Sequence, residues 1–323
     1  MKKTILASAI LLVAGAANAA EVYNNEGATV QLGGSFRGNA VIQKSDDIKF
    51  EDAGSRFDIK AAKELDNGLK VIGTAEIKYS DIEDVNGSKT KIARDSALYL
   101  NKAFVGLAHD VYGTATIGKQ YGLNDDIFFY DFSYMHGNIY QEDNDTLGND
   151  ANEQLKYVKS FAGATVVVSL IDQDAYAIGG TYEVAGLTLG ATYNIANDRD
   201  TDVDGVLADN SNYVVSASYA IDALTVGASY TASDVEDKDT TAYGVGAKYA
   251  LGQASVYVMY DYTEVDKTDV DYSELVIGAD YELAEGVIAY AEFGSRDLSS
   301  DAVTTEFTED SGEIMYIGGR FYF

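Results

Sequence analysis

Apolar and polar residues alternate with a period of two along most of the chain after residue 28. Between residues 55 and 64, for example, Phe57 and Ile59 fall on one face, while Asp58 falls on the other. A β-strand with one dry face and one wet face produces this pattern. Because sixteen segments of the chain show it, we predict an all-β fold of sixteen strands.

The connections between these segments alternate in length. Seven are short turns, such as 65–68 and 184–186, and eight are mostly longer loops rich in Asp, such as 81–94 and 196–210. Strands joined in sequence order by hairpins form an antiparallel meander. We therefore predict that the short turns and both chain termini lie at one end of the sheet, and the long loops at the other.

The polar face decides how this meander closes. Segments such as LTLGATY (187–193) place Gly and Thr on the face opposite Leu, Ala and Tyr. A soluble sandwich needs bulky inner side chains to fill its core, whereas a membrane barrel turns its apolar face to lipid, its tyrosines to the two interfaces and its polar face to water. We predict a 16-stranded antiparallel transmembrane β-barrel, which is wide enough for an aqueous channel.

The N-terminus and the composition narrow the setting. Lys2 and Lys3 precede an apolar run that ends in Ala17-Asn18-Ala19, which predicts a signal peptide over residues 1–19 and a barrel domain over 20–323. Outside that segment no apolar run is long enough for a membrane-spanning helix. The formal net charge of −29 argues against nucleic acid as a partner. With no Cys, the chain has neither disulfides nor zinc–thiolate sites, and the absence of Pro suits strand interiors.

The third long connection, residues 122–153, differs from the others. Its 32 residues hold eight carboxylates, six aromatic rings and no Lys or Arg. A loop of this length is commonly either functional or disordered, and a disordered one would rarely carry so many rings. We expect a packed loop with a function, the alternative being a mobile surface excursion. Its candidate acidic residues are Asp125, Asp126, Asp131, Glu142, Asp143 and Asp145.

Candidate chemistry is otherwise sparse. The chain has two histidines, His109 and His136, and neither has a nucleophile at a meaningful spacing, which argues against an enzyme. The segment 200–205 begins like a calcium-binding loop, but Ser211 stands where an EF-hand needs a bidentate Glu. We therefore predict no cofactor and no dedicated metal site.

Several motifs in order resemble the trimeric general porins of Gram-negative outer membranes. They are AEVYNNEG (20–27), AFVGL (103–107), YGTATIGKQYG (112–122) and the C-terminal GGRFYF. Within that family, FYDFSYMHGN (129–138) is most similar to the third loop of porins from Vibrio-type marine bacteria. The resemblance covers the whole of residues 20–323. It implies an outer-membrane location, a homotrimer, and a third loop that folds inward and narrows the barrel. The partners it implies are outer-membrane lipid and lipopolysaccharide, the barrel-assembly machinery and small hydrophilic solutes.

The resemblance also implies a basic wall facing the acidic loop. Arg56 and Glu76 match family wall positions, Lys60 shares the face of Arg56, and Arg37 and Lys78 also point inward. An alternative is that these side chains are unspecific solvated lining. Two basic positions of the family are expected to be missing, one replaced by Asn101 and one lost within NDANEQLKY (149–157).

Two further roles are implied for single residues. Lys119 resembles the residue that receives the second loop of a neighbouring subunit, and Phe323 resembles the C-terminal assembly signal. The leading hypothesis is a passive channel for small hydrophilic solutes and ions with a moderate cation preference. One alternative is a sugar-selective channel that uses Tyr130, Phe132 and Tyr134 as a sliding surface. Another is a plugged barrel that acts as a surface adhesin or structural protein.

Overall fold

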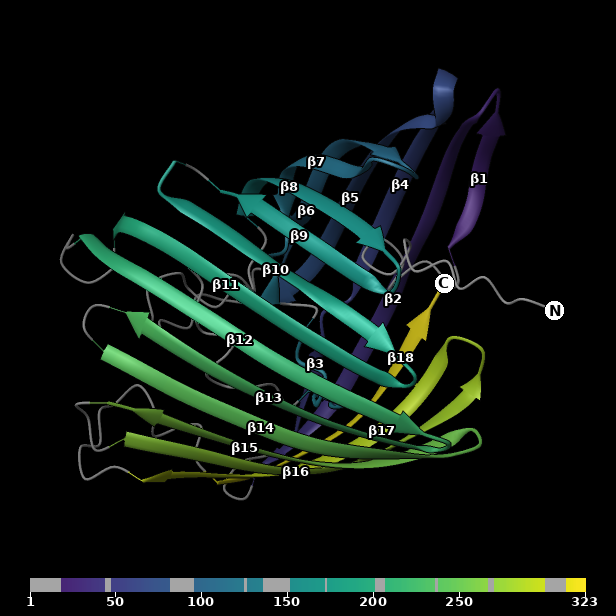
Figure 1. Ribbon diagram of the computed structural model, residues 1–323. Helices are drawn as coiled ribbons and strands as arrows, with labels where there is room; N and C mark the ends of the chain where they lie inside the picture. The colour runs from purple at the N-terminus through teal and green to yellow at the C-terminus, as the bar shows by residue number, and fades with distance from the viewer. Residues whose placement is uncertain are drawn as a thin grey trace.

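The computed structural model describes residues 19–43, 48–81, 96–124, 127–135, 152–171, 173–200, 207–235, 238–266, 270–299 and 312–323. Within these ranges the chain forms one closed antiparallel barrel of sixteen strands (Figure 1). Each strand pairs with the next in sequence, and β18 returns to pair with β2. No helix in this part of the chain is long and apolar enough to cross a membrane.

Sixteen strands make up the barrel wall. They are β2 (Ala28–Gln43), β4 (Arg56–Glu64), β5 (Leu69–Asp81), β6 (Ser96–His109), β7 (Gly113–Gln120), β8 (Asn152–Phe161), β9 (Ala164–Leu170), β10 (Ala175–Val184), β11 (Leu187–Asp200), β12 (Leu207–Ile221), β13 (Leu224–Val235), β14 (Lys238–Leu251), β15 (Ala254–Val265), β16 (Val270–Ala284), β17 (Val287–Ser299) and β18 (Gly312–Tyr322). The predicted count of sixteen strands is confirmed, and so is the alternation of short turns with longer connections.

Two short strands, β1 and β3, lie in line with the wall strands β18 and β4, respectively, along the two edges of β2. β1 (Ala20–Asn25) pairs with the first residues of β2, next to the point where β18 stops. β3 (Lys49–Asp52) pairs with the later part of β2, ahead of β4. Phe323 exchanges two backbone hydrogen bonds with Gly34, which joins the chain end to the middle of β2. β1 and the C-terminus lie at the short-turn end, as predicted (Figure 1). The predicted signal peptide lies outside the described residues except for Ala19.

The two faces of the wall separate as the alternation predicts. Along β15, Val256 and Val258 are each 44% exposed on the outside, whereas Tyr257 and Met259 between and beyond them are buried. The outer surface therefore consists of Val, Leu, Ile, Phe and Tyr, which is the composition that lipid requires. Because closure leaves no wall strand with an open edge, the backbone polar groups are satisfied within the sheet.

Candidate functional site

The described part of the third loop lies against the inner wall, where glycines allow close approach. Four inward-facing glycines form this surface, which we term the loop-binding glycines: Gly190 on β11, Gly227 on β13, and Gly244 and Gly246 on β14. A Cβ at Gly190 would lie 2.9 Å from the ring of Phe129. At the other three positions it would come closer than 3.0 Å to backbone or ring atoms of Phe129 or Tyr130. Any other residue would push the loop away from the wall.

Tyr130 fixes the centre of the loop. Its side chain is fully buried and its hydroxyl donates a hydrogen bond to Asp261 on β15. Burial, together with the Asp261 carboxylate, raises the pKa of the Tyr130 hydroxyl, so the group stays protonated and acts as the donor. Beside it, the Phe129 N–H donates to Ser216 Oγ at 3.1 Å. The loop is thus hydrogen-bonded to the wall as well as packed on it.

A buried carboxylate holds the next part of the loop. Glu292 on β17 is 1% exposed. Its Oε1 accepts the Tyr134 N–H at 2.5 Å and the Tyr257 hydroxyl at 2.5 Å. Its Oε2 accepts the Met135 N–H at 3.0 Å. A charged acceptor shared by two consecutive backbone amides is a strong and directional attachment.

Arg320 on β18 also holds this part of the loop. Its guanidinium donates to the Tyr134 carbonyl and lies 4.7 Å from the centroid of the Tyr134 ring. The Tyr134 ring in turn stacks on Tyr290 at 4.6 Å between centroids. From Phe129 to Met135 the loop is therefore fastened to strands β11 to β18, and the opposite half of the lumen is left open.

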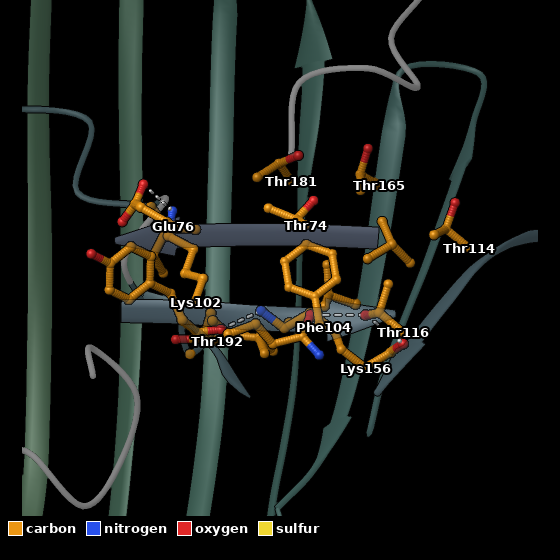
Figure 2. Close-up of a pocket in the computed structure, with 18 of the residues that line it drawn as sticks. Thr74, Glu76, Lys102, Phe104, Thr114, Thr116, Lys156, Thr165, Thr181 and Thr192 are labelled. Atoms are coloured by element: carbon orange, nitrogen blue, oxygen red, sulfur yellow. Dashed lines mark hydrogen bonds and ion pairs between the residues drawn. The ribbon is translucent and has the colours of Figure 1, made fainter. Parts of the chain in front are cut away.

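The open half contains a cavity of about 550 Å³ lined by strands β2 to β11 and by Leu123, Ile127 and Phe129 of the loop. Glu76, which is 3% exposed, lies at the centre of its charged wall. Arg56 lies 3.7 Å and Lys102 3.5 Å from its two carboxylate oxygens, and Asn101 donates a further hydrogen bond. Figure 2 shows Glu76 and Lys102 side by side, with threonine side chains around the same space.

The structure brings most of the predicted wall residues together. Arg37, Arg56, Lys60 and Glu76 line the cavity, and Lys78 is the Cα partner of Arg56 on β5. In the loop, Asp131 is exposed, although the surrounding protein raises the pKa of its carboxyl by desolvation, against the effect of two hydrogen bonds from Ser133. The other predicted loop acids, Asp125, Asp126, Glu142, Asp143 and Asp145, lie outside the described residues.

Two lysines missed in the sequence line the cavity, Lys102 and Lys156. Whether the two family positions at Asn101 and within residues 149–157 are missing stays a prediction, but the cavity wall carries a base beside each of them. A β-bulge between β5 and β6 pairs Glu76 with Lys102 and Ile77 with Leu100. The extra residue, Asn101, turns inward together with Lys102 because a bulge breaks the alternation of faces. Lys156 lies on the face of β8 that the alternation predicts to point inward. Its place in the lumen could therefore have been predicted from the strand pattern.

The described part of the loop does not favour the alternative of an aromatic sliding surface. Tyr130 is fully buried, and Phe132 and Tyr134 pack against Met259 and the neighbouring wall. These rings fasten the loop and do not form a continuous track for a solute. The sequence did not predict this attachment, because the wall residues that these rings contact are more than 100 positions away along the chain. Tyr130 and Asp261 are one such pair.

The remaining candidates lie away from the cavity. Lys119 is on β7, in phase with the outward-facing Ile117. Phe323 packs outside the barrel in an aromatic cluster with Phe36, Phe57 and Phe321. His109 uses both ring nitrogens in contacts with turn backbone at Asn67 and Val111. Among the described residues no cluster of His, Asp or Glu could hold a metal ion.

The sequence and the fold are similar to those of known proteins. The chain is similar to the major outer membrane protein of Pasteurella multocida (strain Pm70), with 27% identity over 91% of this chain and 82% of the relative. In structure it is similar to OmpT of Vibrio cholerae, solved in a trimer form, with a TM-score of 0.73 and 22% identity over 92% of this chain and 99% of that one. It is also similar to an anion-selective porin from Comamonas acidovorans, with a TM-score of 0.75 and 16% identity over 92% of this chain and 100% of that one. A model of the Gram-negative porin family matches residues 6–301, so the chain belongs to the Gram-negative porins, which form non-enzymatic channels in the outer membrane.

Proposed function

We propose that the channel admits small hydrophilic solutes and that the third loop sets its size limit. The observation that carries this proposal is the attachment of residues 129–135 to one wall, which leaves the cavity of about 550 Å³ on the other side. A loop held on one side restricts a lumen without plugging it. The open cavity favours a channel over a plugged barrel that serves only as an adhesin.

We further propose a moderate cation preference that arises mainly at the mouth. The whole chain has a net charge of −29, and most of its acidic residues fall in the long connections. Such a field concentrates cations near the entrance. Arg37, Arg56, Lys60, Lys102 and Lys156 on the cavity wall oppose it at closer range, where salt screens less. The similar porin from Comamonas is named anion-selective, so related barrels can have the opposite preference.

Neutralising wall bases should increase the cation preference. In the double variant Arg56→Gln and Lys60→Gln, we expect the reversal potential under a KCl gradient to move toward the cation limit. Removing the loop carboxylate with Asp131→Asn should move it the other way. Planar-bilayer recordings at about 0.1 M salt give the measurement, because the Debye length is then about 10 Å. An anion-selective wild type would contradict the proposal.

We also propose that the protein is a homotrimer, since the outer surface has two unlike arcs. Every strand from β10 to β16 carries an exposed Tyr: Tyr176, Tyr182, Tyr193, Tyr213, Tyr219, Tyr230, Tyr243, Tyr249, Tyr260 and Tyr281. On β17, β18, β2, β4 and β5, none of the large exposed side chains in the described ranges is Tyr, whereas β6 beyond them carries Tyr99, which is 37% exposed. Tyrosine belts mark the two lipid interfaces of a barrel. The arc without them, which includes the Phe36 and Phe323 cluster, suits contact with other subunits better than contact with lipid.

Lys119 lies on β7, two strands beyond that arc, and we propose that it receives the second loop of a neighbouring subunit. Lys119→Glu should therefore lower the temperature at which the trimer dissociates in detergent, while the barrel remains folded. Samples heated stepwise in SDS and run on gels measure the dissociation temperature, and circular dichroism shows whether the sheet remains folded. Lys70→Glu is a matched control, because Lys70 forms an exposed ion pair with Glu64 at 3.3 Å near a short turn. Equal dissociation temperatures for wild type and Lys119→Glu would remove this assignment.

Two further contacts belong to the proposal. The tyrosine-bearing arc would face outer-membrane lipid and lipopolysaccharide. Phe323, at the chain end and on the outer surface, would be accessible to the barrel-assembly machinery before the barrel closes, and afterwards packs on Phe36 at 5.4 Å.

A further inference from the structure

The outer wall carries an apolar groove near the short-turn end. Its volume is about 590 Å³, and residues of β13 to β18 line it. Three outward-facing alanines are among them, Ala247 on β14, Ala279 on β16 and Ala291 on β17. Their neighbours in the groove, such as Ile277 and Phe293, are larger. The wall is recessed where the alanines lie, because a single methyl group fills less space than those side chains.

The groove lies at the depth of the lipid chains. Tyr281 follows Ala279 by two residues on the same face of β16, and Tyr249 follows Ala247 in the same way on β14. Both tyrosines are exposed and lie toward the short-turn ends of their strands. A row of tyrosines marks the boundary between hydrocarbon and headgroups. The alanines therefore lie on the hydrocarbon side of that boundary, in the leaflet at the short-turn end.

An acyl chain is the occupant that this position favours. Lipid tails are as apolar as the groove, so packing is what holds a chain there. A gap that stays unfilled loses dispersion contacts along its walls. The middle of the groove, on β15 and β16, belongs to the tyrosine-bearing arc, which suits lipid better than another subunit.

The short turns beside the groove form a continuous rim. The Ala250 N–H donates to the Ala223 carbonyl at 2.8 Å, which joins the turn between β12 and β13 to the end of β14. The Glu282 N–H donates to the Gln253 carbonyl at 2.8 Å, which joins the turn between β14 and β15 to the end of β16. A headgroup whose chain fills the groove would therefore contact these turns.

This rim holds acids but no base. Asp222 and Glu285 are exposed, and the turns 221–223, 251–253 and 283–286 contain no Lys or Arg. By contrast, lysines flank the turn between β4 and β5. Because basic residues are what attract anionic lipids, an acidic rim without them favours a headgroup that carries an amine.

We propose that the groove binds one chain of a phospholipid with an amine headgroup, of the phosphatidylethanolamine class. The chain lies over the three alanines, and the ammonium group lies near Asp222 and Glu285. Gln253 accepts the Tyr281 hydroxyl with its side-chain carbonyl at 3.2 Å, which leaves its NH2 group to donate to the phosphate. The site rests on the proposed contact of the tyrosine-bearing arc with lipid and adds to it a place and a headgroup class.

Photo-crosslinking in vesicles tests the site. The protein is reconstituted into equal parts of phosphatidylethanolamine and phosphatidylglycerol, with a trace of one or the other carrying a diazirine in its chain. Adducts mapped by peptide mass spectrometry should concentrate on β14 to β17. Phosphatidylethanolamine should give about three times as many as phosphatidylglycerol, which is the size of effect expected for exposed charge pairs. In the double variant Asp222→Asn and Glu285→Gln, this preference should disappear.

Variants that fill the groove test the place of the chain. Ala279→Phe and Ala291→Phe should each remove most of the groove adducts. Ala279→Leu, a smaller change, should remove part of them even if Ala279→Phe fails to fold. Ala228→Phe is the matched control, because Ala228 is an exposed, outward-facing alanine of β13 that does not line the groove.

Each other result contradicts a separate part of the proposal. Adducts spread evenly over the outer wall would overturn the groove but not the lipid contact of the arc. Groove adducts formed equally by both lipids would overturn the amine headgroup. Adducts on β12 and β13 with none in the groove would mean that protein covers it, and would overturn the lipid site. An absence of adducts on every strand from β10 to β16 would instead overturn the proposed lipid contact itself.

Discussion

Glu292→Ala is expected to release the third loop and give the largest change in channel behaviour. The carboxylate is 1% exposed and accepts three hydrogen bonds, two from consecutive loop amides and one from Tyr257. Hydrogen bonds to a charged group contribute about 1.5–3 kcal/mol each. Without the acceptor, the Tyr134 and Met135 amides stay satisfied only if this part of the loop moves out to water.

The barrel should survive this change, because its sheet hydrogen bonds do not involve the Glu292 side chain. We expect higher and noisier single-channel conductance, and new chymotrypsin cleavage at the aromatic residues of the loop. Glu292→Gln, which keeps one acceptor oxygen, should be intermediate. Glu282→Ala, an exposed carboxylate next to a short turn, is the control. Wild-type conductance together with full protease resistance in Glu292→Ala would show that the loop does not depend on this attachment.

Gly244→Val should displace the same loop by a different physical cause. A Cβ at this position would overlap the ring of Tyr130, which is fully buried. Overpacking of this kind costs about 1–3 kcal/mol. Val is itself favoured over Gly in a strand. The strand should therefore gain stability, while the loop is displaced from the wall. The conductance should therefore rise, whereas the thermal stability of the sheet should stay the same or increase.

A matched glycine on the outer face serves as the control for this variant. At Gly38 on β2 the nearest atom to an added Cβ is the Glu51 carbonyl oxygen, at an ordinary 3.7 Å. Gly38→Val should leave the conductance unchanged. Tyr130→Ala should suppress part of the effect of Gly244→Val, because contacting residues are not additive in a double-mutant cycle. Independent effects of the two substitutions would mean that they do not act through the same contact.

The strands and their faces followed from the sequence because a strand alternates side chains with a fixed period of two. Phe57 and Arg56 fall on opposite faces wherever the strand lies, so the apolar outer surface and the inward position of the bases were predictable one residue at a time. The same local rule placed the short turns and the end of the barrel at which the chain closes.

Three features depended on the tertiary structure. Asn101 faces inward beside Lys102 because a bulge opposite Glu76 breaks the alternation, and a bulge arises from pairing between two strands and not from either one alone. The burial of Tyr130 depends on Gly244 and Asp261, which are far away in the sequence. The role of Glu292 depends on amides of a loop that precedes it by more than 150 residues. The sequence thus determined a barrel with a polar lumen, since that depends on local periodicity. Which side of the lumen stays open was decided only by contacts between distant segments.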